Sequence, residues 1–384
     1  MDALRAQLVH RLRAHGDVRT EAVASAFGRV PRHAFVPGVP ADEAYADRSI
    51  AIKLENGVPI SSSSQPAIMA VMLELLDVRE GDRVLEIGTG SGYNAALLAE
   101  LTGPRGRVVT IDLDAELAAD ARARFAAHGY EHVHVICGDG ALGEPDASPY
   151  DAVISTVGVE RIPAAWIAQL HDGARLVAPL TVRALQKVVA FERTATGLQS
   201  RAVVDAAFMM LRGPSASSDT VTLAAGDPDV ALRVFAQRAN DIAADAVAAA
   251  LRAAHRDARP ARRLSPPEVW NGATLWLALR DDAFCTLTAY GASAERGIVP
   301  NIGREPVGVY GFATTMGLCD AATLAVFAPA GPRDAGLRAF GEGRATLERL
   351  QAAIVAWDDA RRPGNAQLEI AVSTDGATRV RLHA

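Results

Sequence analysis

The sequence predicts an α/β fold with a mostly parallel sheet, followed by a smaller α+β domain. Short apolar runs typical of buried strands alternate with helical stretches through the first half of the chain. Such alternation favours parallel strands, with ligands bound beyond their carboxyl ends. A glycine-rich turn directly after the first of these strands supports the same fold. At 384 residues and 49% hydrophobic, the chain is large enough to form two domains.

The predicted elements follow one another in a regular order. An amphipathic helix is expected at Met1–Arg13, and it lacks the uninterrupted apolar core of a signal peptide. Strands are then predicted at 84–87, 108–111, 133–137, 150–155 and 175–179, with helices at 94–101, 115–128 and 164–170.

The turn after the first strand holds three glycines, Gly88, Gly90 and Gly92. Glycine has no Cβ and the following helix begins with free N–H groups, so a ligand can lie against bare backbone. A dinucleotide fingerprint would have its third glycine at Tyr93, which favours S-adenosylmethionine over NAD. Asp112 ends the next strand, where a carboxylate is placed to accept hydrogen bonds from a ribose. Together these features predict a nucleoside-binding domain.

Composition excludes several other classes of function. The net charge of −6 argues against nucleic-acid binding, and no apolar run approaches the length of a membrane span. The three cysteines are far apart, which fits a reducing cytoplasm. His128, His132 and His134 lie close together, but neither Cys nor carboxylate completes a metal-ligand spacing, so we expect no metal site.

Several separated motifs occur in the order typical of one enzyme family. They are VPRHAFVP at 30–37, AYADR at 44–48, IS at 60–61, SQP at 64–66, LEIGTGSGY at 85–93, GDG at 138–140, YDA at 150–152, IP at 162–163 and LRG at 211–213. Over about residues 1–213 the chain therefore resembles the protein-L-isoaspartate O-methyltransferases. The resemblance implies a class I, Rossmann-like methyltransferase that uses S-adenosylmethionine and releases S-adenosylhomocysteine. It also implies a closing strand near 207–211.

The resemblance also assigns residues to the site. Ser64 and Ser63 are expected to be catalytic, and Ser61, Ser62 and Asp47 to bind the substrate. The cofactor is expected to contact Glu86, Gly88, Thr89, Gly90, Gly92, Asp112, Leu113, Asp139 and Gly140. A carboxylate is already ionised at pH 7, so the enzyme must chiefly align it and exclude water, which small hydroxyls can do. The alternative is that the serines form a flexible, solvated loop without chemistry.

The chain departs from the family pattern in two places. The family usually has a short Thr-Ile-Ser-Gln-Pro segment, whereas 59–66 reads PISSSSQP, and the chain continues for about 170 further residues. Both departures resemble the branch associated with ribosomally made peptides of the lanthipeptide, graspetide and lasso classes. That branch implies methylation of an aspartate in a precursor peptide that is already crosslinked, leading to an aspartimide that is either kept or hydrolysed to isoaspartate. The alternatives are repair of isoaspartyl proteins and a non-catalytic module that binds peptides.

A polar segment at 213–219 predicts the domain boundary. It separates a catalytic domain at 1–213, with a helical part at 1–80 and a Rossmann-like core at 81–213, from an accessory domain at 220–384. In the accessory domain, helices are predicted from Asp227 to about Arg252 and at 344–357. Strands are predicted at 274–279, 284–288 and 323–327, and a hairpin at 368–382.

Two segments of the accessory domain are candidates for peptide binding. Arginines at 252, 256, 259, 262 and 263 form a basic run that would suit an acidic peptide, but a solvated linker explains it as well. The glycine-rich, aromatic stretch 308–317 would suit a peptide cleft, or a turn where backbones approach closely.

Overall fold

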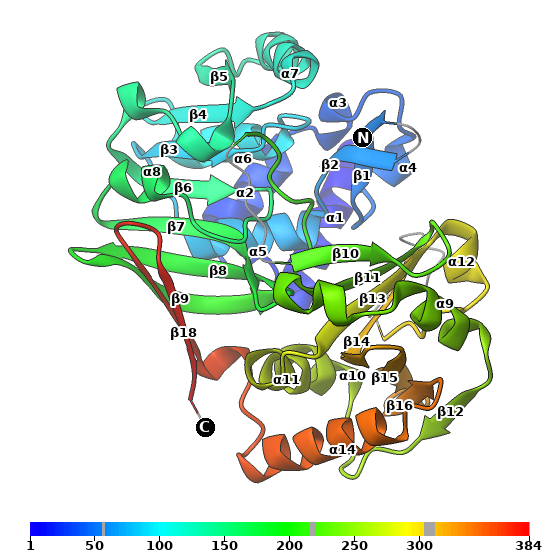
Figure 1. Cartoon of the computed structure of the whole chain (residues 1–384). Helices are drawn as coiled ribbons and strands as arrows, with labels where there is room; N and C mark the ends of the chain where they lie inside the picture. Colours follow the sequence, from blue (N-terminus) through cyan, green and yellow to red (C-terminus); the bar gives the residue numbers. More distant parts are fainter. Residues whose placement is uncertain (56–57, 215–219, 303–311, 384) are drawn as a thin grey trace. The chain divides into compact units, whose positions relative to one another are not determined.

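The chain folds into two compact units in the computed structural model, which describes residues 1–55, 58–214, 220–302 and 312–383 (Figure 1). Unit 1 comprises 1–180, 186–217 and 370–379, and unit 2 comprises 181–185, 218–369 and 380–384. A single boundary near residue 213 would place 181–185 in unit 1 and 370–379 in unit 2. The structure places each of these segments in the other unit.

The amino-terminal part of unit 1 is mainly helical. Its elements are α1 (Asp2–His15), α2 (Glu21–Arg29), α3 (Arg32–Phe35), α4 (Ala41–Ala44), β1 (Ile50–Glu55), β2 (Val58–Ser63) and α5 (Pro66–Leu76). The predicted first helix is confirmed. Strands β1 and β2 form an antiparallel pair in which Ile50 faces Ser63 and Ala51 faces Ser62. Most of the serine segment is therefore a strand, so its interpretation as a flexible loop is wrong.

A nine-stranded sheet forms the centre of unit 1, in the order β18-β17-β9-β8-β7-β6-β3-β4-β5. Its strands are β3 (Arg83–Ile87), β4 (Arg107–Asp112), β5 (Val133–Cys137), β6 (Tyr150–Ser155), β7 (Leu170–Val182), β8 (Leu185–Thr194), β9 (Gly197–Asp205), β17 (Leu368–Ser373) and β18 (Thr378–Leu382). Strands β3 to β7 pair in parallel, as predicted. The connecting helices α6 (Tyr93–Thr102), α7 (Ala115–Ala127) and α8 (Ala164–Ala168) are also confirmed, with short 3₁₀ turns η1 (Gly140–Leu142) and η2 (Pro145–Ala147).

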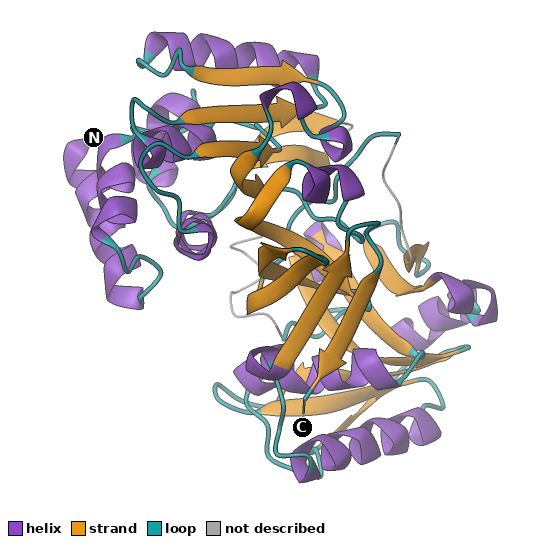
Figure 2. Cartoon of the chain, turned by 90° about the vertical axis from the view of Figure 1, so that its left-hand side faces the viewer, coloured by secondary structure: helices purple, strands orange, loops and turns teal. Residues whose placement is uncertain are grey.

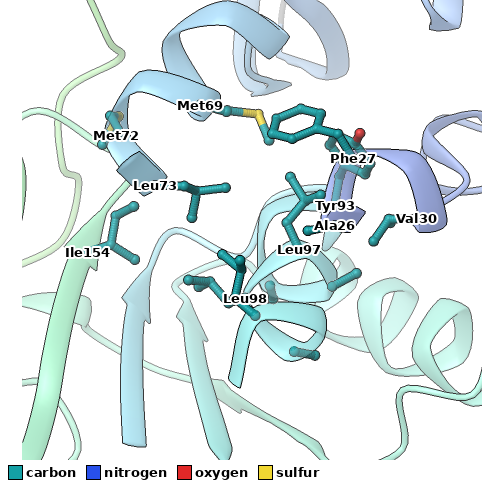
Figure 3. Packing of buried hydrophobic residues seen from close by; sticks show 14 of the residues in the cluster. Ala26, Phe27, Val30, Met69, Met72, Leu73, Tyr93, Leu97, Leu98 and Ile154 are labelled. Atoms are coloured by element: carbon teal, nitrogen blue, oxygen red, sulfur yellow. The ribbon is translucent and has the colours of Figure 1, made fainter. Parts of the chain in front are cut away.

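Helices α2, α5 and α6 share one apolar core, shown in Figure 3. Phe27 from α2, Met69 and Leu73 from α5, and Tyr93 and Leu97 from α6 point toward one another there and are each at most 3% exposed. This core fixes the start of α6, and hence the glycine turn before it, against the helix that follows the serine strand.

Unit 2 is built on a seven-stranded antiparallel sheet in the order β10-β11-β13-β14-β15-β16-β12. The strands are β10 (Thr220–Ala224), β11 (Val230–Phe235), β12 (His255–Ala258), β13 (Phe284–Tyr290), β14 (Phe312–Asp320), β15 (Thr323–Pro329) and β16 (Ala335–Phe340). The helices are η3 (Ala236–Asp241), α9 (Ala244–Arg252), α10 (Pro266–Glu268), η4 (Val269–Ala273), α11 (Thr274–Arg280), α12 (Gly291–Glu295), α14 (Arg344–Asp359) and η5 (Asn365–Gln367). The long helix α14 packs on β14, β15 and β16 (Figure 2).

Three element predictions are wrong. The stretch from Asp227 begins with strand β11, because Val230, Leu232 and Val234 alternate into the core, and only 244–252 is helical. The run 274–279 is helical, because a short apolar run does not distinguish a strand from a buried helix. The closing strand near 207–211 is reduced to an isolated bridge between Met210 and Gly158. The helix at 344–357 and the strands at 284–288 and 323–327 are confirmed.

The predicted carboxy-terminal hairpin is confirmed, but it extends the sheet of unit 1 rather than that of unit 2. Strand β17 pairs antiparallel with β9, where Ser373 faces Gly197. Gly197 has a φ of 139°, and a Cβ on it would lie 2.0 Å from the carbonyl oxygen of Val372. Only glycine therefore permits this close pairing.

The two candidate peptide-binding segments of unit 2 gain little support. Arg262 pairs with Asp358 at 2.8 Å and Arg263 with Asp334 at 2.7 Å, so part of the basic run is neutralised by its own unit. Residues 303–311 of the glycine-rich stretch lie outside the described residues, and 312–317 belong to β14. Among the described residues, no helix is long and apolar enough to cross a membrane.

Candidate active site

The glycine turn at the carboxyl end of β3 has a backbone that other residues could not adopt without strain. Gly88, Gly90 and Gly92 have φ values of 94°, 51° and 86°. A Cβ on Gly88 would lie 2.6 Å from the hydroxyl oxygen of Thr156, which itself donates a hydrogen bond to the Gly88 carbonyl at 2.7 Å. The turn therefore presents bare backbone, as the sequence predicts.

Asp112 links this turn to the end of β4. Its Oδ2 accepts a hydrogen bond of 2.8 Å from the Gly90 amide, and its Oδ1 accepts one of 3.0 Å from the Asp114 amide. Each carboxylate oxygen can accept a further hydrogen bond. Leu113, beside it, leaves 42% of its surface exposed, which suits a flat apolar ligand at this edge.

Glu86 is fully buried beneath the turn and does not line the pocket described below. Its carboxylate accepts hydrogen bonds from Asn94 Nδ2 at 2.8 Å and from the Thr110 hydroxyl at 2.5 Å. Because that hydroxyl proton is used, the Thr89 hydroxyl must donate to Thr110, 2.7 Å away. Burial raises the pKa of Glu86 to about 7 despite these bonds. Glu86 therefore orders the turn from behind.

Asp139 and Gly140 follow β5, which pairs in parallel with β4. Asp139 Oδ1 accepts a hydrogen bond of 3.0 Å from the Ala141 amide and so caps η1. A Cβ on Gly140 would lie 2.6 Å from Ile87, and the Gly140 carbonyl accepts a bond from the Trp166 indole at 2.8 Å. These two residues pack tightly against the strand that carries the glycine turn.

The serine strand and the glycine turn meet in one pocket. It is lined by Ser62, Ser63, Ser64, Met69, Gly88, Thr89, Gly90, Ser91, Tyr93, Asn94 and Thr156. Ser61 lies next to it, since a Cβ on Gly90 would lie 3.6 Å from the Ser61 hydroxyl. The structure thus brings the predicted catalytic serines to the predicted cofactor turn. Asp47, Glu86, Asp112, Leu113, Asp139 and Gly140 are not among the lining residues.

Asp47, expected to bind substrate, instead holds the segment after the serines. Its Oδ2 accepts a hydrogen bond from the Gln65 side chain at 3.0 Å, and its Oδ1 accepts one from the Ala67 amide at 2.8 Å. Both carboxylate oxygens are thus used at the start of α5. Asp47 is therefore placed to position the serine segment, and its contact with the substrate stays a prediction.

Sequence reasoning missed Arg32, which holds the same segment from the other side. Its side chain is fully buried and donates to the carbonyls of Ser64 at 3.0 Å, Arg48 at 3.3 Å and Ser63 at 3.5 Å. It was visible only as part of the motif at 30–37, because an arginine in isolation is usually a surface residue. Tyr93, Asn94 and Thr156 were likewise not predicted to line the site.

The pocket and the neighbouring end of β4 together offer groups that fit S-adenosylmethionine. The glycine turn leaves room against the backbone, and Asp112 offers carboxylate oxygens at the end of β4. Within the described part of the chain, the buried Asn94 Oδ1, Ser63 hydroxyl and Tyr93 hydroxyl have no hydrogen-bond partner. Unpaired buried polar atoms are costly, so their presence on the lining of one pocket fits a polar ligand.

Comparison with known proteins identifies related sequences and folds. The family model described as protein-L-isoaspartate(D-aspartate) O-methyltransferase matches residues 3–215. A protein-L-isoaspartate O-methyltransferase from Methanopyrus kandleri is 42% identical over 194 residues, which are 50% of this chain and 84% of that protein. One from Thermotoga maritima is 36% identical over 173 residues, 45% of this chain and 54% of that protein.

One solved structure resembles the whole chain in fold. It is named protein-L-isoaspartate O-methyltransferase, and the match covers 99% of this chain and 100% of that one, with a TM-score of 0.57 and 21% identity. Unit 2, like unit 1, therefore has a counterpart in the fold of that structure.

Proposed function

The chain belongs to the protein-L-isoaspartate(D-aspartate) O-methyltransferase family and is an S-adenosylmethionine-dependent carboxyl O-methyltransferase, and we propose that the pocket between the serine strand and the glycine turn is its active site. The observation that carries this proposal is the meeting of the two segments, 25 residues apart in sequence between Ser63 and Gly88, in a single pocket.

The chemistry at this site needs alignment more than acid or base catalysis. When bound, S-adenosylmethionine supplies a methyl group on a positively charged sulfur. The glycine turn and Asp112 would hold it, and the hydroxyls of Ser63 and Ser64 would orient the acceptor carboxylate. A carboxylate is ionised at neutral pH, so no residue need remove a proton from it. The residues thus act by positioning the oxygen in line with the methyl group and excluding water.

The acceptor that the comparisons favour is the α-carboxylate of an isoaspartyl residue in a peptide. Relatives named for that activity share 36–45% identity with this chain over 173–194 residues. Methylation there would make a methyl ester, and the neighbouring backbone nitrogen would attack its carbonyl carbon to form the imide and release methanol. This is the reaction of protein repair.

A second acceptor is an ordinary aspartate in a modified precursor peptide. The observation that favours it is the serine segment, which carries four consecutive serines at 61–64. The carboxy-terminal extension does not add to this argument, because a solved structure named protein-L-isoaspartate O-methyltransferase matches nearly the whole chain in fold.

Mass spectrometry of methyl transfer to two peptides tests the proposal. The purified protein is given S-adenosylmethionine with an isoaspartyl peptide, or with a crosslinked precursor peptide from its own gene neighbourhood. We expect a gain of one methyl group, followed by loss of methanol. Methylation of the isoaspartyl peptide alone supports repair, and methylation of the precursor alone supports the second acceptor. If neither is methylated, the proposed peptide acceptor is wrong.

A further inference from the structure

Three buried polar groups, two on the lining of the pocket and one behind it, have no hydrogen-bond partner among the described residues. They are Nε of Arg32 and the hydroxyls of Ser63 and Tyr93. The exposed fractions of these residues are 0%, 3% and 1%. Leaving such a group unpaired in the interior is costly. The two hydroxyls can donate as well as accept, so a ligand with acceptor atoms, such as a carboxylate, can satisfy both, whereas the unpaired Asn94 Oδ1 of the same lining needs a donor.

Arg32 lies directly behind two residues that line the pocket. Its guanidinium donates to the carbonyl oxygens of Ser64 at 3.0 Å and Ser63 at 3.5 Å. Its central carbon lies 5.1 Å from the centre of the Tyr93 ring. The hydrogen-bond acceptors of Arg32 in the described chain are backbone carbonyls, which carry no net charge. Burial lowers the pKa of Arg32, and the nearby Asp47 carboxylate offsets only part of that lowering. The wall therefore has a buried positive charge behind it.

Tyr93 keeps its proton in this environment. Burial raises the pKa of its phenol, and the nearby Arg32 opposes that shift only in part. Its hydroxyl is therefore a donor at physiological pH. The ring packs edge-on against Phe27, with ring centres 6.2 Å apart, so the hydroxyl has little freedom to turn away.

We propose that Ser63, Tyr93 and Arg32 form the recognition site for the carboxylate of the peptide substrate. The two hydroxyls donate hydrogen bonds to the carboxylate, and Arg32 is a positioning residue that fixes the serine carbonyls and supplies the opposite charge. This inference rests on the proposed function, since it concerns the acceptor of the methyl group. It adds the reason why the pocket selects a charged acceptor over its neutral amide.

The test compares two peptides that differ only in the charge of the acceptor. The peptide that is methylated in the mass-spectrometric assay is paired with its counterpart in which the acceptor carboxylate is a carboxamide. Both are titrated into the protein loaded with S-adenosylhomocysteine, so no turnover occurs and calorimetry gives two dissociation constants. We expect the wild-type protein to prefer the carboxylate by at least about tenfold.

Tyr93→Phe and Arg32→Met should each reduce that preference at least fivefold, whereas Arg32→Lys, which keeps the charge, should retain more of it than Arg32→Met. Because the readout is a ratio of two ligands on one protein, a partly destabilised variant still gives a valid value. If Arg32→Met does not fold, Tyr93→Phe carries the test, since it removes a single oxygen atom.

Two matched variants control for the loss of a buried tyrosine or arginine. Tyr150→Phe removes a hydroxyl that donates to the Glu144 carbonyl at 2.9 Å, and Arg83→Met removes a guanidinium that contacts the Ala147 carbonyl. Both residues lie at the amino-terminal ends of their strands, β6 and β3, away from the glycine turn. Both variants should keep the wild-type preference.

The inference fails if Tyr93→Phe and a folded Arg32→Met both keep the wild-type preference. That result leaves the proposed function intact, because the wild-type protein still binds the carboxylate peptide. A wild-type protein that binds S-adenosylhomocysteine but shows no preference between the peptides contradicts the inference as well. Failure of the wild-type protein to bind S-adenosylhomocysteine at all would instead contradict the proposed function.

Discussion

Glu86 is the single residue at which pH should act most directly on the stability of unit 1. It is fully buried, and burial raises the pKa of its carboxyl from 4.5 to about 7. Between these values the folded protein holds a proton that the unfolded chain has released. Stability should therefore fall as pH rises from about 4.5 to about 7, by on the order of 3 kcal/mol, and change little from this group above pH 8.

Denaturant unfolding of the wild-type protein and of Glu86→Gln across pH 4.5–8 measures this effect. The glutamine variant has no titrating group at that position, so the difference between the two free energies of unfolding isolates Glu86. The nearby Asp112 carboxylate also raises the pKa of Glu86, and it is present in both proteins. A difference that stays constant over this range would show that Glu86 does not titrate there.

At the residue scale, positions set by the backbone could be predicted and positions set by the tertiary structure could not. Gly88 and Gly90 follow from a turn that requires positive φ, and the placement of Asp112 follows from the end of the next strand. The positioning contacts of Asp47 and Arg32 could not be predicted, because their partners lie 16–32 residues away in segments whose packing the sequence does not reveal.

The β1–β2 pair is the element that joins the substrate serines to the cofactor side of the site. Lys53 on β1 pairs with Asp114 at 2.7 Å and with Glu116 at 2.6 Å, in the segment that follows Asp112. These ion pairs hold the strand pair against the loop that carries the expected ribose contact. Because Lys53 is partly exposed, salt should weaken the attachment.

Lys53→Met should therefore lower the affinity for S-adenosylhomocysteine a few-fold at low salt and by less at high salt, since the wild-type pair is screened there. Calorimetry at two salt concentrations measures this. Arg105→Met, which removes a surface pair with Glu80 at 3.1 Å, serves as the matched control and should leave the affinity unchanged. Equal affinities for wild type and Lys53→Met at low salt would mean that the strand pair does not need this attachment.

At the element scale, predictions succeed where a long stretch has one clear period. Helix α14 buries Leu347, Leu350 and Ile354 on one face, and that spacing is readable in the sequence. Strand β11 lies where the sequence predicts a helix, because Asp227 and the following proline resemble a helix start. In the structure, the Asp227 carboxylate accepts hydrogen bonds from the Asp229 amide and from Ser293. A turn of this kind replaces the helix start, and it depends on a partner distant in sequence, here Ser293.

Across the whole molecule, each unit is built from segments that are not consecutive in the chain. The parallel part of the unit 1 sheet could be predicted, because each strand is followed by its own helix. The return of β17 to β9 could not, because its alternating apolar pattern fits any sheet with a free edge. The sheet that carries the site therefore includes strands beyond residue 215, where the family match ends.

The carboxy-terminal strands should stabilise unit 1 unequally. Strand β17 buries Ile370 and Val372, which are 0% and 1% exposed, and it covers the edge of β9, whereas β18 pairs at the outer side of β17. Ending the chain after Gln367 removes both strands, uncovers the β9 edge and should cost several kcal/mol, at about 1.5–3 kcal/mol for each buried aliphatic side chain. Ending it after Gly376 removes only β18 and should cost much less.

Denaturant titration followed by loss of S-adenosylhomocysteine binding reports on unit 1, and light scattering reports on association through the open edge, which we expect only for the shorter chain. If both shortened chains unfold at the same denaturant concentration as the full chain, the pairing of β17 with β9 contributes nothing to the stability of the catalytic unit.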